Sequence, residues 1–97
     1  MPRIVRTDRA CADADEIAAH IAEDNPAAAE RWLEELDRVL AFLSSNPEMG
    51  ERVDYLAPGV RRHCLGNYLV FYVPISGGIE FRRALHGSRK IEDIFGR

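Results

Sequence analysis

Apolar residues in the first part of the chain recur every three to four positions, which is the spacing of one helix face. The stripe consists of Ala14, Ile17, Ala18, Ile21 and Ala22. Asp13, with Glu16 three residues later, resembles a capping box and predicts the start of this helix, and Asp24-Asn25 predicts its end. Before the helix, the apolar pair inside Arg3–Arg6 suits a short first strand.

A second helical pattern follows almost at once. Asn25-Pro26 is a good helix start, because asparagine can cap free N–H groups and a proline at the first helical position loses no needed hydrogen bond. Asn46-Pro47 and Gly50 predict the helix end. The apolar stripe between them is Ala29, Trp32, Leu33, Leu36, Val39, Leu40 and Leu43. With so short a connection, the two helices are expected to form an antiparallel hairpin that shares one buried side.

The second half of the chain has the pattern of three strands joined by tight turns. The strands are expected at Val60–Leu65, Tyr68–Ile75 and Ile79–His86, with Gly66-Asn67 and Ser76-Gly77-Gly78 as turns. A short final helix is expected from Ser88 to Phe95. The predicted fold class is therefore α+β, with a strand and a helix hairpin followed by a three-strand antiparallel meander and a short C-terminal helix. The length predicts a single domain, residues 1–97.

The middle strand of this meander is apolar on both sides. Alternation points Leu69, Phe71 and Val73 to one face and Tyr68, Val70 and Tyr72 to the other. The helix hairpin can cover only one of these faces. Another chain is therefore a candidate to cover the second face.

Composition excludes several classes of protein. Hydrophobic residues at 46% and charged residues at 30% are ordinary for a globular domain. No stretch approaches the roughly 20 apolar residues that span a bilayer, and the N-terminus lacks the apolar block of a secretory signal. Cys11 and Cys64 form no disulfide or metal-binding pattern, so they are expected to be small, partly buried residues in a reduced, cytoplasmic protein without metal or cofactor.

The net charge of −3 hides an asymmetry between the two halves. Residues 1–51 carry five arginines against twelve acidic residues, a net −7, whereas residues 52–97 carry eight basic against four acidic residues, a net +4. The basic half is suited to meet a polyanion or an acidic protein segment. Ordinary solvated charge explains the split equally well.

Six short blocks resemble sequences of the ParE branch of the RelE/ParE toxin superfamily, in that family's order. They are Ala14-Asp15-Glu16-Ile17 with His20-Ile21-Ala22, Asp24-Asn25-Pro26-Ala27-Ala28-Ala29, Asn46-Pro47-Glu48-Met49-Gly50, Gly59-Val60-Arg61, Asn67-Tyr68-Leu69-Val70-Phe71-Tyr72 and Leu85-His86-Gly87-Ser88-Arg89. The resemblance implies the RelE/ParE fold and the toxin of a type II toxin–antitoxin pair. It also implies a cognate ParD-like antitoxin that wraps a disordered segment around the toxin and covers its apolar surface.

The superfamily uses one fold for two mechanisms. ParE-like toxins poison DNA gyrase, and RelE-like toxins cut messenger RNA on the ribosome. Cutting RNA requires a base, an acid and cations that stabilise the phosphorane. Arg61, Arg82, His86 and Glu51 are the candidates for such a site, with Arg62, Arg83 and Glu48 as substitutes. Strict alternation places Glu80, Arg82 and His86 on one face of the last strand, and Arg83 on the other with Ile79, Phe81 and Leu85.

Three features favour a toxin that binds gyrase over a nuclease. His86 and Arg89 form a His-Gly-x-Arg motif typical of the ParE branch, no tyrosine follows His86, and the acidic balance suits ribosome docking poorly, so direct nucleic-acid binding is not expected. A ribosome-dependent endoribonuclease remains one alternative. The other is a non-toxic module that only binds an antitoxin.

Candidate residues for binding the antitoxin or the target are Trp32, Arg61, Tyr68, Tyr72, Arg82, His86 and Arg89. Each has a structural alternative. Trp32 lies in the helical stripe and suits the core, and the two tyrosines suit cross-strand packing. His86 can hydrogen-bond backbone at the strand end. Arg89 stands at the start of the expected final helix, where the helix dipole disfavours a cation, and this position favours a functional role.

Overall fold

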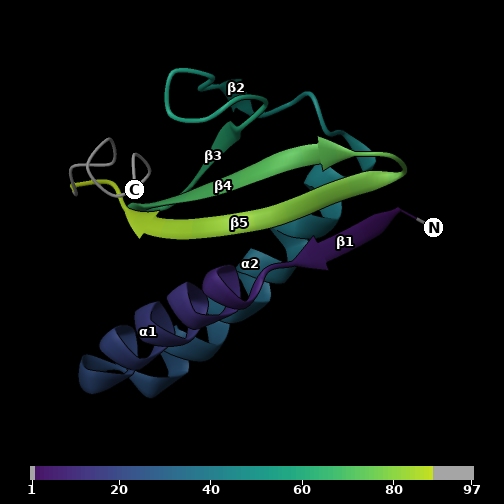
Figure 1. Cartoon of the computed structure of the whole chain (residues 1–97). Coiled ribbons are helices and arrows are strands. Elements are labelled where there is room, and N and C mark those ends of the chain that lie inside the picture. Colours follow the sequence, from purple (N-terminus) through teal and green to yellow (C-terminus); the bar gives the residue numbers. More distant parts are fainter. Residues whose placement is uncertain (1, 89–97) are drawn as a thin grey trace.

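A helical hairpin lies against one face of a mixed β-sheet (Figure 1). The computed structural model describes residues 2–88. In chain order the elements are β1 (Arg3–Arg6), α1 (Asp8–Asp24), α2 (Pro26–Ser45), β2 (Glu51–Arg52), β3 (Arg61–Leu65), β4 (Tyr68–Ile75) and β5 (Gly78–His86). The α+β class predicted from the sequence is confirmed. The helix expected from Ser88 to Phe95 lies outside the described residues, apart from Ser88.

The sheet has the strand order β1-β5-β4-β3-β2. The three strands of the predicted meander are present within one residue of their expected bounds, and each pairs antiparallel with the next. β1 lies parallel to β5 at one edge, and all the other elements lie between these two strands in sequence. The short β2, which was not expected, pairs with the start of β3 at the other edge.

The start of α1 differs from the expectation. Thr7, not Asp13, caps the helix: its hydroxyl accepts a hydrogen bond from the Ala10 N–H at 3.1 Å. Asp13 lies inside the helix and is only 4% exposed. The apolar stripe begins late because residues 8–12 contain only small or polar side chains, so periodicity alone placed the start nearly two turns too far along the chain.

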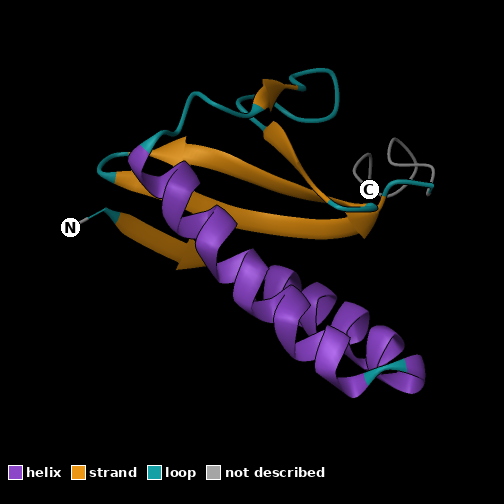
Figure 2. Cartoon of the chain, turned by 180° about the vertical axis from the view of Figure 1, so that it is seen from behind, coloured by secondary structure: helices purple, strands orange, loops and turns teal. Residues whose placement is uncertain are grey.

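The junction between the helices is as expected. α1 ends at Asp24, and the Asn25 side chain accepts a hydrogen bond from the Ala28 N–H at 3.1 Å to cap α2, with Pro26 in the first turn. α2 ends at Ser45, before Asn46-Pro47. Figure 2 shows both helices on the same side of the sheet.

The main core lies between this hairpin and the sheet. Its buried members are Ala10, Ala14, Ile17, Trp32, Leu36, Leu40, Leu43, Leu65, Val70, Tyr72, Ile79, Phe81 and Ala84. Burial of so many apolar side chains between layers is the main force that holds the fold together. Leu33, which the sequence pattern assigned to the buried stripe, is 36% exposed instead.

The second face of the sheet has a smaller core. Phe71 and Leu85 are buried there against Val53 and Val60, which flank the loop between β2 and β3. Figure 1 shows this loop on the opposite side of the sheet from the helices. The expectation that another chain covers this face is therefore wrong for the centre of the face, because the chain's own loop covers that part. Leu69 and Val73 remain only partly buried.

Neither helix in residues 2–88 is both long and apolar enough to cross a membrane.

Candidate functional site

A β-bulge changes which side chains of β5 share a face. Tyr72 on β4 pairs with Phe81 and the preceding Phe71 pairs with Arg83, so Arg82 is an extra residue on β5. Before the bulge, Phe81 faces the helices; after it, the alternation is reversed and Leu85 faces the opposite side. His86 therefore lies on the helix side, opposite Tyr68.

The expectation that Arg82 and His86 share one face is thus wrong. Arg82 forms an ion pair with Glu80 at 2.7 Å, two residues earlier on the same strand. Glu80 pairs with Val73, on the face away from the helices. Strict alternation fails here because one added residue in a strand moves every later side chain to the other face.

Asp13 fixes the bulge to α1. Its carboxylate accepts hydrogen bonds from Arg83 Nε at 2.7 Å and Nη2 at 3.2 Å, and from the backbone N–H of Ala84 at 3.1 Å. Arg9, one turn earlier on α1, lies 3.7 Å from the same carboxylate. Because Asp13 is buried, these donors replace the water that its charge would lose on folding.

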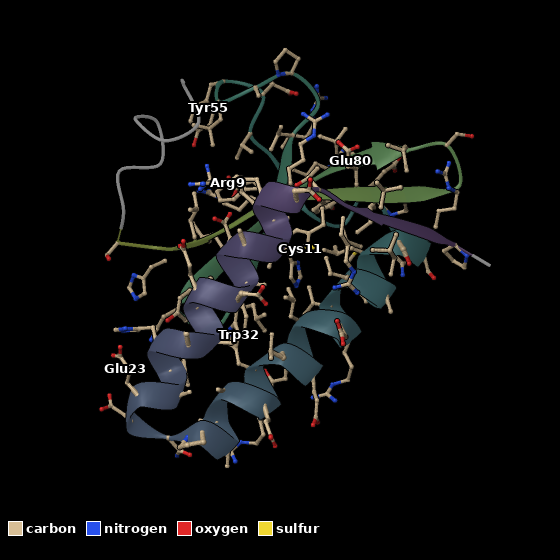
Figure 3. The ribbon with its side chains drawn as sticks, turned by 60° about the horizontal axis from the view of Figure 1, so that its bottom comes forward. Arg9, Cys11, Glu23, Trp32, Tyr55 and Glu80 are labelled. Atoms are coloured by element: carbon tan, nitrogen blue, oxygen red, sulfur yellow. The ribbon has the colours of Figure 1, made fainter. Side chains whose placement is uncertain are left out.

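Three rings form a row beside this anchor. Trp32 on α2 meets Tyr68 edge-on with the ring centroids 5.5 Å apart, and Tyr68 meets His86 edge-on at 5.2 Å. Figure 3 shows Trp32 between the two helices. The indole N–H of Trp32 is buried and has no acceptor among residues 2–88. Trp32 is only 9% exposed, so its main role is in the core.

The His86 ring at the end of this row also contacts Ser88. Its Nδ1 accepts a hydrogen bond from the backbone N–H of Ser88 at 3.1 Å and lies 2.7 Å from the Ser88 hydroxyl.

Between α1 and the end of β5 lies a groove of about 350 Å³, which we call the α1–β5 groove. Its lining consists of Asp13, Glu16, Ile17 and His20 from α1 and Tyr68, Ala84, Leu85 and His86 from the sheet. His20 lies 3.6 Å from Glu23 on the same helix, at the rim. The groove has the volume and the mixture of apolar and polar groups that binding sites use.

Arg61 and Tyr72, which are partners on β3 and β4, have structural roles away from this groove. Arg61 Nη1 donates to the carbonyls of Glu48 at 3.1 Å and Gly50 at 2.8 Å. The Tyr72 hydroxyl donates to the Pro47 carbonyl and accepts from the Gly50 N–H, both at 2.8 Å. Burial raises the pKa of the Tyr72 phenol above its usual 10.0. Because Tyr72 is fully buried, it offers no surface to a partner in this conformation.

The four candidate nuclease residues do not converge. Arg61 is bound to the backbone of the loop before β2, and Glu51 is paired with Arg62 at 2.6 Å. Arg82 lies on the face away from the helices, and His86 lies on the helix side. Arg89 lies outside the described residues. No group of three or more His, Cys, Asp or Glu side chains in residues 2–88 is arranged to hold a metal ion.

Most of the α1–β5 groove was not expected from the sequence. Tyr68 and His86 were predicted as binding residues, but Asp13, Glu16 and His20 were not. One signal was present: Asp13 stands on the apolar face of the helix, three and four residues before Glu16 and Ile17. A charged residue is almost never fully buried without a partner, so its place on an apolar face indicates a buried ion pair.

Comparisons with known proteins agree with this fold. The family model described as the ParE toxin of the type II toxin–antitoxin system parDE matches residues 4–91. Toxin ParE1 from two strains of Mycobacterium tuberculosis is 36% identical over 59 residues, which are 60% of this chain and 60% of that protein. The chain thus matches less than two thirds of the length of these relatives.

A solved structure has the same fold. It is titled "Chromosomal ParDE TA system from P. aeruginosa", and it superposes with a TM-score of 0.72 at 21% identity over 89% of this chain and 96% of that one. At this identity the likeness concerns the fold alone. The family match covers nearly the whole chain, and the chain therefore belongs to the ParE toxin family of type II toxin–antitoxin systems.

Proposed function

We propose that this chain is a toxin that inhibits DNA gyrase by binding it, and that a cognate ParD-like antitoxin neutralises it. Family membership supports a toxin of the ParE type. The His86-Gly87-x-Arg89 motif supports the ParE branch over the RelE branch.

The candidate nuclease residues lie apart from one another, and this separation is the observation that favours binding over RNA cleavage. General acid–base cleavage needs its acid, base and cations within hydrogen-bond reach of one phosphate. Arg82 and His86 lie on opposite faces of the sheet, and Glu51 is occupied by Arg62 at the far edge from β5. This arrangement favours a toxin that acts by binding.

Partly exposed apolar residues support a protein partner. Leu69 and Val73 lie at the margin of the smaller core, and Phe42 on α2 is 45% exposed. Tyr55, in the loop that covers the second face, is 70% exposed. An antitoxin segment that folds on binding would bury such side chains, in keeping with coupled folding and binding.

Purified chain added to a gyrase supercoiling assay tests the proposal. We expect supercoiling to stop at saturating toxin and to be restored when the antitoxin is mixed with the toxin first. Primer extension on translated messages after induction provides the contrast, because a ribosome-dependent nuclease would leave codon-phased cuts. Expression without the antitoxin should arrest growth; normal growth would instead indicate a module that only binds its antitoxin.

A further inference from the structure

We propose that the α1–β5 groove is the site that receives an arginine side chain of the antitoxin. The inference rests on the proposed function in one respect, since it takes the antitoxin to be the partner. It specifies the chemistry of one contact, which neither the family match nor the fold provides. The occupant follows from the charge, the rings and the apolar wall of the groove.

The carboxylates that line the groove favour a positively charged occupant. Two carboxylates, of Asp13 and Glu16, line the groove, and among residues 2–88 no lysine or arginine does. Asp13 is saturated by Arg83 and the Ala84 N–H. Glu16 is exposed and has no hydrogen bond or ion pair within residues 2–88. Glu16 is therefore a lining carboxylate without a direct partner among the described residues, and its natural partner is a cation.

Arg9 and Arg83 both form ion pairs with Asp13, which lines this groove. These two guanidinium groups share the single Asp13 carboxylate, so the charges of Arg9, Arg83, Asp13 and Glu16 sum to zero and the longer-range attraction comes from the rest of the helix. Further along α1, Asp15, Glu23 and Asp24 are exposed on a helix whose half of the chain carries a net −7. Figure 3 shows Glu23 near the far end of the helix hairpin. This field attracts a basic segment over a longer range than the groove itself.

The two rings in the groove favour arginine over lysine. Tyr68 and His86 stand at 84° to each other, so they present one ring face and one ring edge side by side. A planar guanidinium can stack on such a face while it donates to a carboxylate, which an ammonium group cannot do.

The remaining wall fits the rest of the side chain. Ile17 is 9% exposed and Ala84 is 2% exposed, and both contribute apolar surface between the carboxylate and the rings. The methylene groups of an arginine side chain gain burial against such surface while the charged end stays at the rim.

Nuclear magnetic resonance with N-acetyl-arginine amide as the probe tests the groove directly. We expect saturable shifts of the amide signals of Ile17, Ala84 and Leu85 and of the Trp32 indole N–H. N-acetyl-citrulline amide has nearly the same shape without the charge and should cause none of them. N-acetyl-lysine amide should bind more weakly than the arginine probe.

Substitutions distinguish binding in the groove from a general attraction to exposed carboxylates. Glu16→Gln should weaken binding of the arginine probe by about two- to fivefold, the range for an exposed ion pair. Glu30→Gln, which removes an exposed carboxylate from α2, should leave binding unchanged. Glu16→Gln should also weaken binding of the antitoxin. Equal binding of the probe to Glu16→Gln, or the absence of shifts confined to the groove, would overturn the proposal.

Two other occupants give different results, and either would overturn the proposal. Shifts of the same signals on simple dilution would mean that a second copy of the chain occupies the groove. Shifts caused by Arg89→Gln without any probe would mean that the chain's own C-terminal segment occupies it. The supercoiling assay on the unsubstituted chain tests the proposed function separately, so a failure there is distinguishable from a failure of the groove.

Discussion

Asp13 and Arg83 form a buried, two-pronged ion pair that ties α1 to the bulge of β5, with Nε–Oδ2 at 2.7 Å and Nη2–Oδ1 at 3.2 Å. The same carboxylate holds the Ala84 N–H at 3.1 Å. The pair therefore lies where β5 changes its alternation and turns His86 toward the helices.

Asp13→Ala should destabilise the fold by about 3–5 kcal/mol, because it leaves the Arg83 charge in a site that is nearly closed to water. Chemical denaturation measures the loss. Asp15→Ala, on the exposed side of the same helix, is the matched control and should change stability by less than about 0.5 kcal/mol. A loss from Asp13→Ala below about 1 kcal/mol would mean that the pair contributes no more than a surface ion pair.

Thr7→Ala should cost about 1 kcal/mol, since it removes the hydroxyl that caps α1. The same hydroxyl lies 3.3 Å from the carbonyls of Phe81 and Arg82, so the cap also joins the helix to β5. Thermal unfolding should show a midpoint lower by about 4–8 °C. Thr7→Ser keeps the hydroxyl and should retain most of the stability. An equal loss in both variants would contradict the role assigned to the hydroxyl.

Tyr72→Phe should cost about 1–3 kcal/mol at neutral pH. The variant leaves the buried Gly50 N–H and the Pro47 carbonyl without their partner. Tyr55→Phe removes a hydroxyl from a side chain that is 70% exposed, and it should be neutral in the same urea titration. If the two variants lost equal stability, the hydroxyl of Tyr72 would have no special role.

Tyr72 also predicts a dependence on pH. Burial raises the pKa of its phenol in the folded chain above the usual 10.0, so the unfolded chain loses this proton first as the pH rises. The stability from this proton is complete below pH 10.0 and is lost as the pH rises from there through the folded-state pKa. Urea titrations above pH 10.0 should therefore show a steeper loss for the native chain than for Tyr72→Phe. Parallel curves for the native chain and Tyr72→Phe would contradict this role of the Tyr72 proton.

Glu51→Gln should leave growth arrest intact. Glu51 is one of the candidate nuclease residues, yet its side chain is 65% exposed and bound to Arg62. Loss of this exposed pair should lower stability by less than about 1 kcal/mol. Growth curves after induction measure toxicity, and normal growth of the variant with an intact fold would favour a nuclease.

Local patterns were sufficient to predict most of the fold. Asn25-Pro26 marked the junction of the helices, and Gly66-Asn67 set the turn of the meander. Both signals depend on residues adjacent in sequence, which is why they could be found. The parallel pairing of β1 with β5 has no such local signal, since it joins residues more than seventy positions apart, such as Ile4 and Ile79.

The candidate site depended on two features that local patterns do not reveal. The bulge at Arg82 occurs without a glycine, in a run of ordinary strand residues, so strict alternation placed His86 on the wrong side. Asp13 was interpreted as a cap because its partner, Arg83, is seventy residues away. A long-range ion pair and a one-residue change of register arise from packing between elements. Both features alter which side chains meet at the site, whereas neither alters the order of helices and strands.

A titration of purified chain into a gyrase supercoiling assay is the most direct test of the proposed mechanism. Inhibition should increase with the ratio of chain to gyrase, reach completion, and be reversed by the antitoxin. Full supercoiling at a saturating excess of correctly folded chain would contradict inhibition of gyrase.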